Sequence, residues 1–113
     1  MKGIGVDIVE FERIERVLKK EKFVDKILSD AEKNVYYDLK NEKRKMEYLA
    51  GRFAIKEAIY KAASNVCQGM SFSDFSILND SAGAPYLAAP NISSLMISLS
   101  HSKNYVIAFV VFL

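Results

Sequence analysis

The chain has 113 residues, of which 50% are hydrophobic and 27% charged, and its formal net charge at pH 7 is +2. This length suits one domain with its own core, and we expect a single domain over residues 1–113. The small charge argues against a polycation that coats nucleic acid, and no apolar run approaches the roughly 20 residues of a membrane helix. The single cysteine, Cys67, allows no intrachain disulfide, and no signal peptide is apparent, so we expect a cytoplasmic protein.

The first third of the chain predicts one strand followed by short helices. Residues 3–9 are rich in β-branched side chains and are expected to form a buried strand. From Glu10 onwards the apolar residues repeat at helical spacing, and a second short helical stretch covers residues 23–28. Ser29 and Glu32 match a capping box, which predicts the start of a third helix.

A long helix and a series of strands are expected in the rest of the chain. The helix covers about residues 41–64. Strands over residues 74–78 and 85–88 flank a glycine-containing turn, and two further strands cover 95–101 and 105–112. A strand, then helices, then an antiparallel β-meander indicates an α+β fold.

The long helix carries two stripes of different character. The core stripe consists of Ile55, Ala58, Ile59 and Ala62. The second stripe places Glu57 and Lys61 one turn apart, in line with Ala50 and Ala54. Because alanine is small, this stripe predicts room for a ligand beside Glu57.

Asp7 and Glu57 are lone carboxylates in apolar or small-residue surroundings, and Lys61 lies beside Glu57. Mg²⁺ binds carboxylates and usually keeps water and substrate phosphates in its other positions. These residues therefore suggest a site for a hard cation with a phosphate partner. Two alternatives stay open: Asp7 caps the helix that follows it, or Glu57 and Lys61 form an ordinary surface pair.

His101 is the only histidine and lies at the end of an alternating strand, between Ser100 and Ser102. A lone histidine in this position is more often structural than a ligand. The same position also suits hydrogen bonds to a phosphate or nucleotide. One histidine and one cysteine disfavour most zinc sites.

Basic residues form two groups on the predicted helices. Arg13, Arg16 and Lys20 share a face of the first helix, which is either a plain solvated face or a docking surface for an acidic partner. No interleaved aromatic platform supports nucleic-acid binding. A second group, compatible with a multiply phosphorylated ligand, consists of Lys43, Arg44, Lys45, Arg52 and Lys56.

Five segments in a fixed order span nearly the whole chain. They are GIGVDIVEFERI, ILSDAE, GRFAIKEAIYKA, FSDFSILNDSAGAPYL and ISLSHSKNYVIAFVV. Each is weak alone, but together, in this order and spacing, they are highly specific. The chain resembles the holo-[acyl-carrier-protein] synthases, the short, single-module branch of the 4′-phosphopantetheinyl transferases.

This resemblance implies a Mg²⁺-dependent transferase of fatty acid biosynthesis. A serine hydroxyl of apo acyl carrier protein attacks the β-phosphorus of coenzyme A, phosphopantetheine moves to the serine, and 3′,5′-ADP leaves. Asp7 and Glu57 would hold Mg²⁺ against the diphosphate, and Lys61 would contact the phosphates. We expect a metal-bound water rather than Glu57 to take the serine proton, because a carboxylate that binds the metal is a weak base.

The resemblance also implies partner surfaces. Arg13, with Arg16 and Lys20, would dock the acidic carrier protein. The expected coenzyme A contacts are Lys61, His101, Ser100, Arg52 and Lys43. The family is typically a homotrimer with active sites between subunits. Such an assembly needs apolar surface beyond that buried in one small sheet, and we expect this surface on the last strand and on the face of Leu95, Ile97 and Leu99. One departure is the segment 63–67, where many relatives have a glycine-rich turn.

Two other functions are compatible with the residues. A non-catalytic module would bind acidic carrier domains through the Arg13 face, regardless of Mg²⁺ or coenzyme A. A small nucleotide- or RNA-binding α+β domain would show salt-sensitive nucleic-acid affinity, which the modest net charge disfavours.

Overall fold

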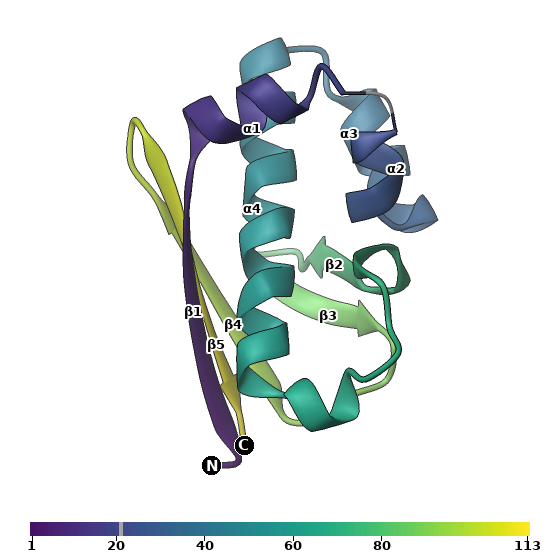
Figure 1. The fold of residues 1–113 in the computed structure, drawn as a ribbon, viewed down its shortest axis with the longest axis vertical. Coiled ribbons are helices and arrows are strands. Elements are labelled where there is room, and N and C mark those ends of the chain that lie inside the picture. The colour runs from purple at the N-terminus through teal and green to yellow at the C-terminus, as the bar shows by residue number, and fades with distance from the viewer. Residues whose placement is uncertain (21) are drawn as a thin grey trace.

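The computed structural model describes residues 1–20 and 22–113 (Figure 1). The first half consists of β1 (Gly3–Glu10), α1 (Phe11–Val17), α2 (Phe23–Ile27), α3 (Asp30–Asp38) and α4 (Glu42–Ala62). After 3₁₀ turns at Ser64–Val66 and Phe72–Asp74, the second half consists of β2 (Ser76–Asn79), β3 (Pro85–Ala89), β4 (Leu95–His101) and β5 (Tyr105–Phe112). Within these described ranges, no helix combines the length and apolarity of a membrane span.

The strands form two antiparallel sheets, which confirms the predicted α+β class. One sheet has the order β1-β5-β4, and β2 pairs with β3 in the other. The predicted antiparallel meander is interrupted, since β3 and β4 belong to different sheets, and the N-terminal strand joins the main sheet beside β5. The two chain ends consequently lie side by side, and the Lys2 amide donates to the Phe112 carbonyl at 2.6 Å (Figure 1).

Helix α4 packs across one face of the β1-β5-β4 sheet (Figure 1). The predicted core stripe of α4 is confirmed, since Ile55, Ala58 and Ile59 are fully buried. Ala50 and Ala54 are equally buried. The alanines of the second stripe therefore belong to the core, although Glu57 and Lys61 do not, and the predicted open approach to Glu57 along these alanines is wrong.

The opposite face of the sheet is apolar and exposed. Strand alternation and register place its larger side chains in cross-strand rows. The exposed fractions lie between 41% and 61% for Ile4, Val6, Ile8, Met96, Ile107 and Phe109. We call these six residues the outer sheet face. Leu95, Ile97 and Leu99 alternate with Met96 and face the helix instead, so the spare apolar surface was assigned to the wrong side of β4.

A buried ion pair joins α3 to the middle of α4. The Lys56 ammonium donates to Glu32 Oε1 and, at 2.6 Å, to the Ile27 carbonyl. Glu32 also accepts from the backbone amides of Ser29, at 2.9 Å, and Ile77, at 2.8 Å. Both charged side chains are fully buried. Lys56 therefore does not belong to the basic surface group predicted for α4.

The predicted capping box is present at the start of α3. Ser29 Oγ accepts from the Glu32 amide at 3.2 Å, while the Glu32 carboxylate accepts from the Ser29 amide. The same carboxylate thus caps a helix and balances the Lys56 charge. Burial lowers the pKa of Lys56, and the Glu32 carboxylate opposes that shift.

Replacing Glu32 with alanine is expected to lower the free energy of unfolding by about 3–5 kcal/mol, because the Lys56 charge loses its buried partner. Urea unfolding followed by circular dichroism measures this loss. The matched control is Asp25→Asn, which breaks the exposed pair between Asp25 and Lys33 and should change stability little. Equal losses in the two variants would contradict a structural role for the buried pair.

Candidate functional site

Two glycines allow β1 to lie directly against α4. A Cβ atom on Gly5 would lie 2.0 Å from the Ala58 carbonyl oxygen, and one on Gly3 would lie 1.8 Å from the Ala62 carbonyl oxygen. No other residue fits at these two positions without moving the strand. Asp7 follows Gly5 by two residues and therefore faces the same helix.

Asp7 lies within β1 and contacts a cation from α4. Lys61 Nζ donates to the Val6 carbonyl at 2.9 Å and lies 3.4 Å from Asp7 Oδ1. The Asp7 side chain is 18% exposed and that of Lys61 53%. Asp7 is opposite Ala108 in the ladder, and the residue at the N-cap of α1 is Glu10. The alternative that Asp7 caps α1 is therefore wrong.

Glu57 precedes Lys61 by one turn of α4 and is half-buried. Lys61 forms its ion pair with Asp7, so the alternative of an ordinary Glu57–Lys61 surface pair is wrong. Residues four apart share a side of a helix, which places Glu57 on the side of α4 from which Lys61 reaches β1. Among the described residues, no group of three or more His, Cys, Asp or Glu side chains gathers as a metal centre would.

Arg52 and His101 line a cleft of about 420 Å³ between α4 and β4, together with Arg44 and Asn79. Arg52 is only 4% exposed. Its Nε donates to the Ile77 carbonyl at 3.2 Å and its Nη2 to Asn79 Oδ1 at 2.9 Å. Burial lowers the pKa of this guanidinium. Arg52 therefore fixes one wall of the cleft, and Arg44 is the exposed guanidinium beside it.

Ser100 and His101 point to opposite faces of β4. His101 pairs with Val106, on the side of the sheet that α4 covers, and its ring lies 6.4 Å from the Phe11 ring. Ser100 pairs with Ile107, on the outer side. Both residues nevertheless line a small pocket at this strand end, together with Ser102, Tyr105 and Ile107.

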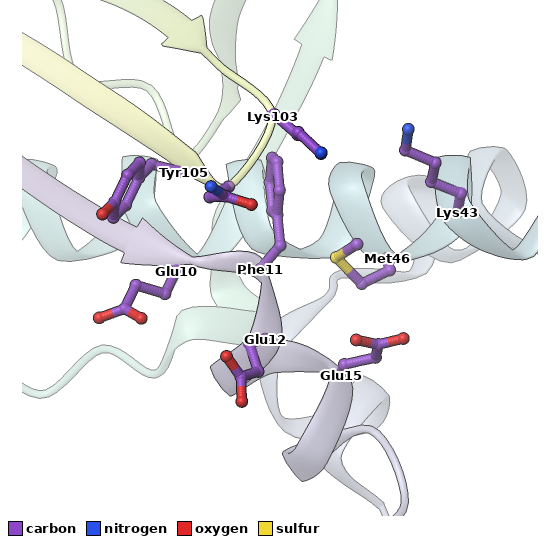
Figure 2. A pocket seen from close by; sticks show the side chains of 9 residues that line it. Glu10, Phe11, Glu12, Glu15, Lys43, Met46, Lys103 and Tyr105 are labelled. Carbon is purple, nitrogen blue, oxygen red and sulfur yellow. The ribbon is translucent and has the colours of Figure 1, made fainter.

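Lys43 lines a different pocket, of about 510 Å³, near the junction of β1 and α1. Figure 2 shows Lys43 and Lys103 on one side of this pocket, with Glu12 and Glu15 of α1 on the other. Lys43 precedes Lys61 by 18 residues of α4, or about 27 Å along the helix axis. Within one chain, these two predicted coenzyme A contacts are far apart.

The predicted docking residues are all exposed. Arg13 and Arg16 lie on α1, whereas Lys20 lies in the turn after α1 ends. The Arg13 guanidinium lies 5.6 Å from the centre of the Phe53 ring, which comes from α4. This aromatic support was not predicted, because a cation–π contact between separate helices leaves no local pattern in the sequence.

Five of the predicted metal and coenzyme A residues fall into two groups on opposite edges of the sheet, whereas Lys43 and Ser100 belong to neither group. Asp7 and Lys61 meet at β1, with Glu57 nearby on α4. Arg52 and His101 line the cleft beside β4. Strand β5 lies between these edges, which separates them by about 10 Å. The sequence did not single out Asn79, although its place beside a turn marked it as a loop residue that can bind through its amide.

Comparison with known proteins identifies the family. A family model described as the 4′-phosphopantetheinyl transferase superfamily matches residues 3–110. The chain belongs to this superfamily. The holo-[acyl-carrier-protein] synthase of Acholeplasma laidlawii is 46% identical over 111 residues, which span 96% of this chain and 93% of that protein. The resemblance seen in the five segments, and the transferase class that it implied, are confirmed.

Solved structures of the superfamily share the fold. A holo-(acyl-carrier-protein) synthase from Bacillus anthracis in complex with CoA (3′,5′-ADP) is 41% identical, with a TM-score of 0.82, over 96% of this chain and 93% of that chain. An acyl carrier protein synthase from Plasmodium yoelii with ADP bound is 28% identical, with a TM-score of 0.84, over 97% and 93% of the two chains.

Replacing Gly5 with alanine is expected to lower the free energy of unfolding by about 1–3 kcal/mol, because the new methyl group meets the backbone of α4. The control is Gly51→Ala, whose Cβ would meet only a Leu99 methyl group at 3.2 Å, in a helix that favours alanine. Urea unfolding of both variants tests this. A Gly5→Ala protein as stable as Gly51→Ala would show that β1 does not need the close approach.

Proposed function

We propose that this chain transfers the 4′-phosphopantetheine group of coenzyme A to a serine of apo acyl carrier protein, in fatty acid biosynthesis in the cytoplasm, and that residues 1–113 act as one domain. The observation that carries the proposal is the contact of Lys61 with Asp7, held where two of the five segments, GIGVDIVEFERI and GRFAIKEAIYKA, meet. The coenzyme A complex of the Bacillus anthracis relative supports the substrate.

In this reaction the serine Oγ forms a bond to the β-phosphorus while the bond from that phosphorus to the 3′,5′-ADP oxygen breaks. The serine proton passes to water. Lys61 is a flexible ammonium with a half-exposed side chain, so it can turn from β1 to the diphosphate and offset its negative charge.

The donor set fits Mg²⁺, because Asp7 and Glu57 offer carboxylate oxygens on the same side of α4. These two residues would hold the ion. When bound, it neutralises charge on the diphosphate and on the leaving group. Asp7 is fixed by the strand and Glu57 by the helix, so the carboxylates are placed by rigid elements rather than by a loop.

We further propose that an acidic carrier protein docks on α1 through Arg13 and Arg16, with Lys20 beside them. All three are exposed, and stacking on Phe53 limits the freedom of Arg13 before a partner arrives. A protein that only binds carriers would use the same surface. Turnover that depends on Glu57 separates the two functions.

A homotrimer with active sites between subunits would join the two residue groups. The cleft with Arg52 and His101 would then lie on one subunit and Asp7 with Glu57 on its neighbour, which accounts for their separation on opposite sheet edges. The outer sheet face supplies the apolar surface for such an assembly.

Replacing Glu57 with glutamine is expected to lower the transfer rate by about 100-fold or more, because the metal loses a charged ligand worth several kcal/mol. The rate is measured by intact-mass spectrometry of apo acyl carrier protein incubated with coenzyme A and Mg²⁺, in which each product gains one phosphopantetheine group. Glu42→Gln, at the exposed start of α4, is the control and should retain activity. A fully active Glu57→Gln protein would overturn the metal assignment.

Replacing Phe109 with lysine is expected to convert an assembled protein into monomers, because a charge would enter the outer sheet face. Light scattering coupled to size-exclusion chromatography measures the mass. Tyr37→Lys is the control, since Tyr37 is 58% exposed but lies on α3 and lines neither the sheet face nor the cleft. A wild-type monomer at micromolar concentration would refute the trimer.

A further inference from the structure

The Lys61 ammonium is the cation that lies beside the Asp7 carboxylate in this structure. Its ammonium combines a hydrogen bond of ordinary length to the Val6 carbonyl, at 2.9 Å, with a longer ionic contact of 3.4 Å to Asp7 Oδ1. The carboxylate is 18% exposed, whereas 53% of the Lys61 side chain is in solvent. The lysine therefore reaches a largely enclosed anion from the solvent side.

This contact is weak enough to be exchanged. A half-exposed pair at 3.4 Å contributes little free energy, and the four-carbon stem of lysine moves its charge at small cost. Lys56, five residues earlier, shows the opposite case, since it is fully buried and donates to both Glu32 and Ile27. Of these two lysines, Lys61 is the one that can change partners.

A divalent ion at Asp7 and the Lys61 ammonium are cations that compete for one carboxylate. An ion that arrives alone displaces the ammonium from Asp7 and then repels it at short range. An ion that arrives with a diphosphate brings a new anionic partner for the displaced ammonium. The cost of displacing Lys61 therefore falls when the diphosphate is present.

We propose that Lys61 is the intramolecular counter-ion of Asp7 and weakens divalent-cation binding until a diphosphate substrate is present. The inference rests on the proposed metal site and goes beyond it, because it assigns Lys61 a role before substrate binds. Without coenzyme A the lysine keeps Asp7 neutralised. With coenzyme A it moves to the phosphates, and the metal takes its place.

The test measures the affinity for Mn²⁺, a paramagnetic probe whose free concentration is read by electron paramagnetic resonance, with no turnover involved. Without coenzyme A, Lys61→Met is expected to bind Mn²⁺ about twofold to fivefold more tightly than the wild type, as expected from the loss of a competing surface pair. Lys61→Arg keeps the charge and should bind no more tightly than the wild type. Thermal unfolding confirms that each variant is folded.

The control for net charge is Lys40→Met. Lys40 is exposed and precedes the N-terminus of α4, whereas Lys61 is near its C-terminus, so the two are separated by about the length of the helix, roughly 30 Å. Lys40→Met should bind Mn²⁺ as the wild type does. If Lys61→Met also binds like the wild type, or if Lys40→Met tightens binding equally, Lys61 is not a local counter-ion.

A separate measurement distinguishes failure of this inference from failure of the proposed function. Wild-type protein and Asp7→Asn are each titrated with Mn²⁺ in the presence of coenzyme A. A titration of coenzyme A without protein gives the Mn²⁺ that coenzyme A binds by itself. Binding by the wild type that Asp7→Asn loses supports the metal site, whatever the Lys61 variants do. Equal binding by the two proteins would overturn the metal site and the inference together.

Discussion

The backbone of β1 lies against α4 because residues 3 and 5 have no side chain, and much of the molecule follows from this approach. Gly3, Gly5 and Asp7 share the helix-facing side of the strand. Asp7 is thereby brought to within reach of Lys61. The same alternation turns Ile4, Val6 and Ile8 outward, where they form part of the exposed outer sheet face. One packing constraint thus places both the candidate catalytic carboxylate and the apolar surface that the proposed trimer would bury.

The link between site and surface gives the proposed assembly a physical reason. Neither sheet edge alone carries all the groups that the proposed reaction needs, since Asp7 is at β1 and His101 at β4. A subunit interface formed on the outer sheet face leaves both edges at its border, where two chains can share a substrate. Ser100, which points to that outer side, would then lie close to the interface rather than in the cleft with His101.

Local patterns predicted most elements because their causes are local. The capping box at Ser29 and the long apolar stripe of α4 depend on residues three or four apart, and both are present. Strand pairing depends on contacts between segments that are far apart in the sequence, so the placement of β1 beside β5 could not be predicted from local patterns. The partners of Arg52 and Lys56 were missed for the same reason. Charged side chains are usually exposed. The hydrogen-bond partners that allow Arg52 and Lys56 to be buried include Glu32 of α3 and Ile77 of β2, each 20 or more residues away in the chain.

Lys56 and Lys61 lie in one segment, FAIKEAIYKA, and show why residue type alone does not assign a role. Five residues of helix rotate the side chain by about 140°, so the two lysines leave α4 in different directions. Lys56 enters the core, where Glu32 and the Ile27 carbonyl occupy its ammonium and removing either charge is costly. Lys61 leaves at the edge of the sheet, where a 3.4 Å contact to Asp7 in partial solvent holds it only loosely. The enclosed surroundings of Lys56 fix its charge in place, whereas the open surroundings of Lys61 leave its charge free to move, as the proposed site for a metal and a diphosphate would require.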